Sequence, residues 1–185
     1  MSKQSWQEVL VTAQGDGTAL TAASAASCLP AAAKFTLPNN FFDGAGKVIK
    51  VTALGRISCA VTTPGTARFD VRFGSTVVWD SAALNLNTTA QTTVPWILEV
   101  WLTCRAVGQS TTATVLGIGR FQSEAVVGSA ADTAGGNGSL LCPVGAPAVG
   151  TGFDSTASQA VDLYFTQTVA TGSLTLHQYI LEAIN

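Results

Sequence analysis

The sequence has few ionic groups. Its 185 residues include 9 Lys and Arg, 11 Asp and Glu and a single His, so charged residues make up 11% of the chain. An ordinary soluble domain has about 25% charged residues. The formal net charge is −2, and neither a basic patch nor an acidic tail is present. Nucleic acid and anionic membrane surfaces are therefore not expected partners.

Long apolar runs and metal-binding motifs are also missing. No run of about 18 apolar residues occurs, so no membrane-spanning helix is expected. The first residues, MSKQSWQEVLVTAQ, lack the apolar core of a secretion signal, and we expect a protein that is made and used without secretion. Four cysteines form no C-x-x-C pair, and one His cannot complete the usual zinc ligand sets. We expect reduced thiols that pack as small apolar side chains.

Catalytic motifs are absent as well. His177 lies in a predicted strand, and the sequence has no G-x-S-x-G nucleophile elbow. The pair Gly117 and Gly119 is not followed by the rest of a phosphate-binding loop. The carboxylates in or beside predicted strands are Asp70, Asp80, Glu99 and Glu124. Each has a basic residue nearby in the sequence or across a hairpin, so ion pairing explains them. We predict a protein that is not an enzyme and uses no cofactor or metal.

What the sequence does contain is β-structure. PWILEVWLTCRAV, residues 95–107, alternates with period two, and RFDVRF, residues 68–73, places its apolar side chains on one side. Gly74-Ser75 then predicts a two-residue hairpin loop. About eight strands separated by turn residues, without a convincing long helix, predict an all-β fold, a single jelly roll or β-sandwich.

Two segments differ from this pattern. SWQEVLVTAQ fits either a short helix or a weakly patterned strand, and a small-residue stretch follows it. We predict that residues 1–33 form an extended arm along the chain's own body or a neighbour's, and that residues 34–185 form the sandwich domain. Residues 128–157, rich in Gly and Pro, predict a long functional or interface-forming loop with at most a short strand. Gly55, inside the predicted strand 47–62, predicts a bulge or bend.

The low charge favours a surface that is shared with copies of the same chain. Arg68, Asp70 and Arg72 alternate in sign along one side of a strand, which predicts a ladder of adjacent ion pairs that could orient a neighbouring subunit. Ile97, Trp101 and Tyr179 are expected to face outward, and large apolar side chains anchor most interfaces. The predicted subunit-interface residues are Trp6, Arg68, Arg72, Ile97, Trp101 and Tyr179.

A resemblance to a known family rests on several stretches. They are GTALTAASAASCLP, FTLPNNFF, GKVIKVTALGRIS, TPGTARFDVRFGSTVVWDS and the final FTQTVATGSLTLHQYILEAIN. They resemble a module of tailed-bacteriophage structural proteins, the single jelly-roll head decoration, or cement, proteins. The match is clear over residues 17–82, and the last stretch extends it over most of the chain. Its motifs are structural rather than catalytic.

The resemblance implies a virion structural protein. It would be assembled in the host cytoplasm and bind the outer surface of the phage head as a homotrimer, with the major capsid protein as partner and a stabilised head as result. The same module resembles parts of tail and fibre proteins. The alternative is therefore a tail or fibre component with a carbohydrate- or receptor-binding jelly roll.

Overall fold

The structure, a computed structural model, describes residues 6–60, 64–129 and 138–184. It consists of strands and one short 3-10 helix, η1 (Ala31–Ala33). The strands are β1 (Gln7–Thr12), β2 (Ala26–Ser27), β3 (Phe35–Leu37), β4 (Val48–Cys59), β5 (Thr66–Phe73), β6 (Thr76–Asp80), β7 (Leu84–Leu86), β8 (Gln91–Ala106), β9 (Thr114–Ser123), β10 (Val126–Ser129), β11 (Ser139–Cys142), β12 (Gln159–Gln167) and β13 (Ser173–Ile184).

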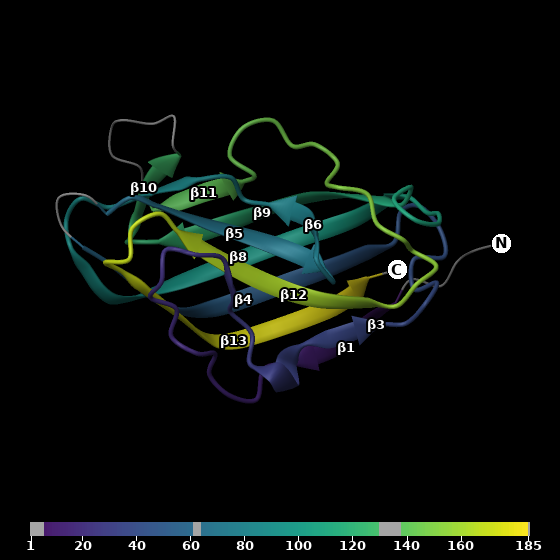
Figure 1. Cartoon of the computed structure of the whole chain (residues 1–185), viewed down its shortest axis with the longest axis horizontal. Coiled ribbons are helices and arrows are strands. Elements are labelled where there is room, and N and C mark those ends of the chain that lie inside the picture. The colour runs from purple at the N-terminus through teal and green to yellow at the C-terminus, as the bar shows by residue number, and fades with distance from the viewer. Residues whose placement is uncertain (1–5, 61–63, 130–137, 185) are drawn as a thin grey trace.

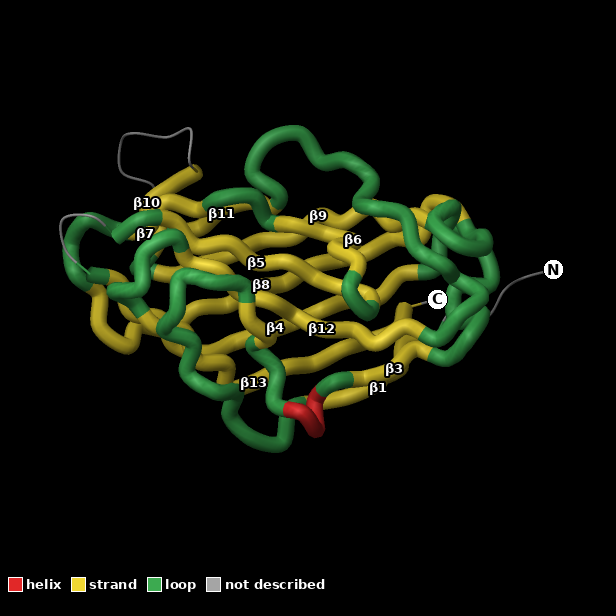
Figure 2. Tube along the Cα trace, in the orientation of Figure 1, coloured by secondary structure: helices red, strands yellow, loops and turns green. Residues whose placement is uncertain are grey.

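Two antiparallel sheets pack face to face (Figures 1 and 2). Sheet A has the order β1-β13-β4-β8-β9-β11, and sheet B has the order β10-β7-β5-β12-β2, with β3 beside β12 and β6 beside β5. The early strand β4 pairs with the late strand β13 in sheet A, and the early strand β5 pairs with the late strand β12 in sheet B. Each sheet therefore combines early and late parts of the chain. The predicted all-β sandwich is confirmed, and the hairpin at Gly74-Ser75 joins β5 to β6 as expected.

Aromatic rings from both sheets fill the core. Phe69 of β5 lies 5.3 Å from Trp96, 5.1 Å from Phe121 and 5.3 Å from Phe165, measured between ring centroids. All four side chains are almost completely buried. The alternation that predicted these strands therefore places every second side chain between the sheets, and removal of these rings from water supplies much of the driving force for folding.

A bulge or bend is predicted at Gly55 of β4. The structure places the bulge in β13, the strand that pairs with Gly55. Leu176 pairs with Gly55 and Gln178 pairs with Leu54, so His177 is an extra residue that forms a bulge in β13. A Cβ on Gly55 would lie 2.0 Å from the carbonyl oxygen of Thr175, so only glycine permits this close approach.

The bulge reverses which side chains of β13 face the core. An inserted residue moves the side chains beyond it to the opposite face of the sheet. Tyr179 is consequently 1% exposed and packs inside the sandwich. The prediction that Tyr179 faces outward is wrong, and a side chain buried within its own chain cannot anchor contacts to another subunit.

The described part of the predicted arm, residues 6–33, lies along the chain's own body. SWQEVLVTAQ contributes a strand, β1, which pairs with β13 at the edge of sheet A. The chain then crosses to sheet B, where β2 pairs with β12. The segment thus contributes edge strands to both sheets.

The predicted loop 128–157 is only partly described, because residues 130–137 lie outside the described residues. Its described part includes the short strand β11 at the edge of sheet A. Val149 forms a bridge with Leu116 of β9, and Phe153 forms one with Ala113, just before β9. The amide of Val144 donates to the carbonyl oxygen of Ser81 beyond β6. This segment closes the side of the sandwich between β9 and β6 (Figure 1).

All four cysteines, Cys28, Cys59, Cys104 and Cys142, are buried and free, which confirms the prediction of packed, reduced thiols. Burial raises the pKa of Cys142 to about 12. It also raises the pKa of Cys28 and of Cys104. Because the thiolate is the reactive form, burial lowers the reactivity of Cys28, Cys104 and Cys142.

Candidate functional site

The outer side of sheet A carries most of the exposed large apolar side chains. Val9, Trp101, Ile118 and Leu141 are 53%, 39%, 47% and 77% exposed. They come from β1, β8, β9 and β11, and the half-buried Ile97 of β8 points to the same side. We call these five side chains the apolar face. The other exposed large apolar residues in the described chain are Trp6, Val107 and Val149.

The strand register aligns part of the apolar face in a row. Val9 pairs with Glu182, which pairs with Lys50; Lys50 pairs with Trp101, which pairs with Ile118. The row therefore crosses five adjacent strands of one rigid sheet. Its apolar side chains are held by backbone pairing and need no reordering to meet a partner, which lowers the entropic cost of binding.

Most charges beside this face have partners: Lys50 and Arg120 both contact the carboxylate of Glu99, and Glu182 accepts a hydrogen bond from Gln7. Glu99 receives Lys50 Nζ at 3.1 Å on one carboxylate oxygen and Arg120 Nε at 2.5 Å on the other. Lys50 also lies 5.2 Å from the centre of the Trp101 ring. The ion pairing predicted for Glu99 is confirmed, and the carboxylate beside Trp101 does not oppose an apolar contact.

The charge network predicts an acid-sensitive contribution to stability. Burial alone would raise the pKa of Glu99, but hydrogen bonds from Lys50 and Arg120 outweigh it and hold the pKa below its ordinary value of 4.5. A carboxylate whose pKa is lower in the folded protein stabilises the fold at pH values above its pKa in the unfolded chain. This contribution is lost as the pH falls through the pKa of the carboxylate in the folded protein. In urea titrations from about pH 6 to about pH 3, Glu99→Gln should lose less stability than wild type. An equal loss in both proteins would contradict this assignment.

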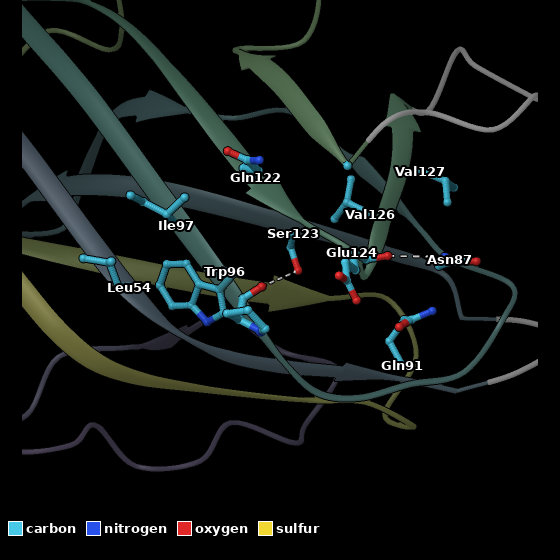
Figure 3. Close-up of a pocket in the computed structure, with 12 residues that line it drawn as sticks. Leu54, Asn87, Gln91, Trp96, Ile97, Gln122, Ser123, Glu124, Val126 and Val127 are labelled. Carbon is cyan, nitrogen blue, oxygen red and sulfur yellow. Dashed lines mark hydrogen bonds between the residues drawn. The ribbon is translucent and has the colours of Figure 1, made fainter.

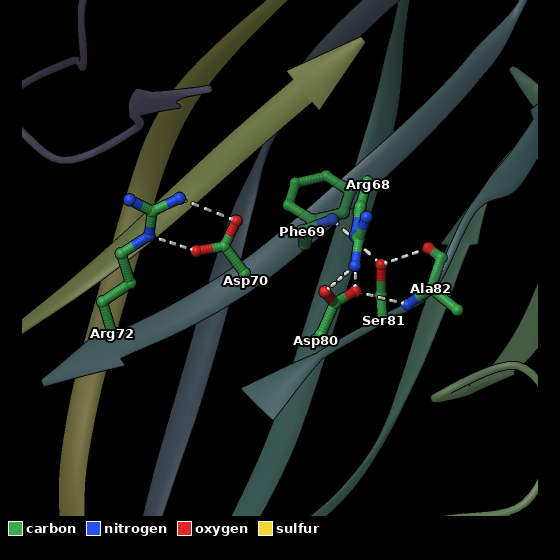
Figure 4. A network of polar contacts seen from close by, with 7 residues as sticks. All are labelled: Arg68, Phe69, Asp70, Arg72, Asp80, Ser81 and Ala82. Carbon is green, nitrogen blue, oxygen red and sulfur yellow. Dashed lines mark hydrogen bonds and ion pairs between the residues drawn. The ribbon is translucent and has the colours of Figure 1, made fainter. Parts of the chain in front are cut away.

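The outer side of sheet B is polar and ion-paired (Figure 4). Arg72 Nε donates to Asp70 at 2.5 Å, and Arg68 forms an ion pair with Asp80 across the β5–β6 hairpin. Hydrogen bonds to these carboxylates raise the pKa of both arginines. The predicted ion pair between Arg72 and Asp70 is therefore confirmed. The predicted pairing of Arg68 with Asp70 is wrong, because Arg68 pairs with Asp80 on the neighbouring strand.

The N-terminal segment adds to the same polar surface. Lys34 Nζ lies 2.7 Å from Asp162, and the hydroxyl of Ser27 donates to that carboxylate at 2.6 Å. The guanidinium of Arg72 stacks over Tyr164 at 3.7 Å from the ring centre. Sheet B thus satisfies its charges within the chain, whereas sheet A leaves apolar side chains exposed.

The structure does not gather the predicted interface residues on one surface. Ile97 and Trp101 lie on the apolar face, and Trp6 is 46% exposed beside β1. Arg68 and Arg72 lie on the outer side of sheet B. Sequence reasoning missed Val9, Ile118 and Leu141. The alternation of LGIGRF, residues 116–121, indicates that Ile118 faces outward, because this residue lies on the opposite side of the strand from Phe121.

A second feature is a groove of about 810 Å³ near the turn between β9 and β10 (Figure 3). Leu54, Ile97 and Gln122 line it from three neighbouring strands of sheet A. Gln91 and Glu124 line it from the start of β8 and from the turn after β9.

Several hydrogen bonds brace the wall of this groove. The side chain of Asn87 donates to the carbonyl oxygen of Glu124 at 3.3 Å and accepts from the amide of Thr89 at 2.9 Å. The hydroxyl of Ser123 donates to the carbonyl oxygen of Pro95 at 2.9 Å. These bonds tie the β9–β10 turn to the chain around β8.

Within residues 6–60, 64–129 and 138–184, no group of three or more His, Cys, Asp or Glu residues is arranged to hold a metal ion. The same residues contain no helix that is both long and apolar enough to cross a membrane.

Comparison with known proteins assigns no family. No family model and no curated protein matches the sequence. A solved structure with a similar outline is the CBM2 module of the evolved Dit protein of Lactobacillus casei BL23 phage J-1. It matches over 99% of this chain and 98% of that chain, with 11% sequence identity and a TM-score of 0.37. A similarity this weak supports no functional conclusion.

Proposed function

We propose that this protein is a structural component of a tailed-bacteriophage virion: a capsid decoration, or cement, protein without enzymatic activity. In this proposal it binds the major capsid protein on the outer surface of the head as a homotrimer and stabilises the head, after assembly in the host cytoplasm. The observation that carries the proposal is the apolar face of sheet A. The location in the virion, the trimer and the capsid partner are inferred from the resemblance of the sequence to the decoration family.

The apolar face suits a subunit contact because of what it exposes. Aromatic and aliphatic side chains without unpaired charge form the centres of stable interfaces. Trp101 contributes a large ring to the row, and Ile118 pairs with it on the neighbouring strand. In a chain with 11% charged residues, little electrostatic repulsion opposes contact between copies.

Contact through the face is favoured over pairing of sheet edges. At the β1 edge, the register shifts between Val9 and Val11, and Glu8 is exposed although its strand position faces the core. A bulge and an inward-pointing charge are features that block edge-to-edge pairing. The opposite edge, β11, has only four residues. The edges of sheet A are therefore protected, while its outer side is not.

The proposal predicts a self-associating protein whose association depends on Ile118. Ile118→Asp places a charge among the exposed apolar side chains and should weaken association at least about 30-fold, because buried interface anchors contribute about 2 kcal/mol or more. Multi-angle light scattering over a dilution series measures the effect. Val107→Asp is the matched control, because Val107 is 43% exposed but lies just beyond the end of β8. A wild-type protein that remains monomeric at every concentration would contradict the proposal.

Placement on the head is tested separately. Recombinant protein should bind capsids that lack their decoration protein, and Ile118→Asp should reduce that binding. The alternative, a tail or fibre component with a carbohydrate- or receptor-binding jelly roll, is supported by the groove beside β9. Binding to host polysaccharide without binding to capsids would favour this alternative.

A further inference from the structure

We propose that the groove between the β9–β10 turn and the start of β8 binds an uncharged, hydroxyl-rich ligand, a neutral saccharide chain. This inference does not rest on the decoration role, because the groove and its polar groups exist in the single chain.

Polar side chains without partners line the groove. Within the described part of the chain, the carboxamides of Gln91 and Gln122 and the carboxylate of Glu124 make no hydrogen bond to other residues. The ion pairing predicted for Glu124 is therefore wrong among these residues. Gln122 and Gln91 lie on opposite sides of the groove, with Glu124 between them (Figure 3). Carboxamides offer both donors and acceptors, and a carboxylate accepts strongly, which together match the hydroxyl groups of a sugar.

The charge of the lining favours a neutral ligand. Among the described residues that line the groove, Glu124 carries a charge, and none is Lys, Arg or His. Phosphates, nucleic acids and uronic-acid polymers would meet a carboxylate without a compensating cation, which disfavours their binding. A neutral ligand meets no such repulsion.

Strand addition cannot occur at the floor of the groove. Leu54, Ile97 and Gln122 belong to β4, β8 and β9, and each of these strands is paired on both sides at this position. Their backbone donors and acceptors are occupied, so an extended peptide cannot pair with them as an added strand. The floor instead offers the aliphatic side chains of Leu54 and Ile97, against which the C–H surface of a sugar ring can pack.

The test uses ¹H–¹⁵N NMR of the side-chain amides of the whole chain. The probes are methyl glycosides of glucose, galactose, mannose, rhamnose and N-acetylglucosamine, together with maltohexaose and a dextran oligosaccharide. We expect at least one probe to shift the NH₂ signals of Gln91 and Gln122 in a saturable manner. We expect Gln122→Ala to weaken that binding about tenfold, the effect of roughly one lost hydrogen bond.

Gln109→Ala is the matched control, because Gln109 is an exposed glutamine in the β8–β9 turn and is not among the groove residues. It should leave binding unchanged. A hexagalacturonate should bind more weakly than the neutral probes. Absence of saturable shifts with every neutral probe, equal binding by Gln122→Ala, or preference for hexagalacturonate would each overturn the proposal. None of these results bears on whether the protein binds capsids.

Discussion

Replacing Phe69 with alanine should lower the free energy of unfolding by about 3–5 kcal/mol, the largest effect we expect from a single core substitution. Phe69 is 0% exposed, and its ring contacts Trp96, Phe121 and Phe165. These three rings come from β8, β9 and β12, so Phe69 joins both sheets. Its removal would leave a cavity that rigid, paired strands cannot close.

Urea unfolding monitored by tryptophan fluorescence measures this loss, because Trp96 lies within the same cluster. Phe41→Ala is the control, since Phe41 is only half-buried and packs at the margin of the core. It should cost about 1 kcal/mol, as partial burial provides less transfer free energy. Similar losses in both variants would show that the Phe69 cluster is not the centre of the sandwich.

Replacing Arg72 with methionine should cost about 2–3 kcal/mol, because it leaves the carboxylate of Asp70 without its partner. Asp70 is 5% exposed and receives two hydrogen bonds from Arg72. Methionine retains much of the aliphatic side-chain volume over Tyr164, so the cost reports mainly the unpaired charge. Urea titration at neutral pH measures it.

Arg68→Met is the matched control on the same strand and the same side. The Arg68 side chain is 53% exposed, so its pair with Asp80 is screened by water and should contribute at most about 1 kcal/mol. The double variant Asp70→Asn with Arg72→Met should recover part of the loss, because no buried charge remains. Equal costs for the two arginines would refute the distinction between a buried and an exposed pair.

Local sequence patterns predicted the sandwich well. The alternation of residues 95–107 places Leu98, Val100 and Leu102 in the core and Trp101 outside, as expected. The hairpin at Gly74-Ser75 also follows from residue type alone, because Gly74 adopts a φ of 59°. Where strand and turn signals are local and agree, the sequence is sufficient to predict the structure.

Long-range register could not be predicted in the same way. Tyr179 was expected outside because a regular strand would alternate without interruption from Leu176. The bulge at His177 depends on space beside Gly55, more than a hundred residues earlier. The groove depends likewise on the β7–β8 connection lying beside the β9–β10 turn, which brings Gln91 and Gln122 together. No pattern within either segment records that proximity.

The position of β1 affects how the chain can fold during synthesis. In the described structure β1 pairs with β13, and Gln7 bonds to Glu182 across 175 positions of sequence. Because β1 precedes β13 by most of the described chain, β1 cannot take its place in sheet A until β13 has been synthesised. Sheet A is completed only when β13 inserts between β1 and β4. Before β13 is available, β1 has no partner in the sheet and β4 is an edge strand, because it pairs only with β8. Slow closure of this high-contact-order sheet should limit the rate of folding.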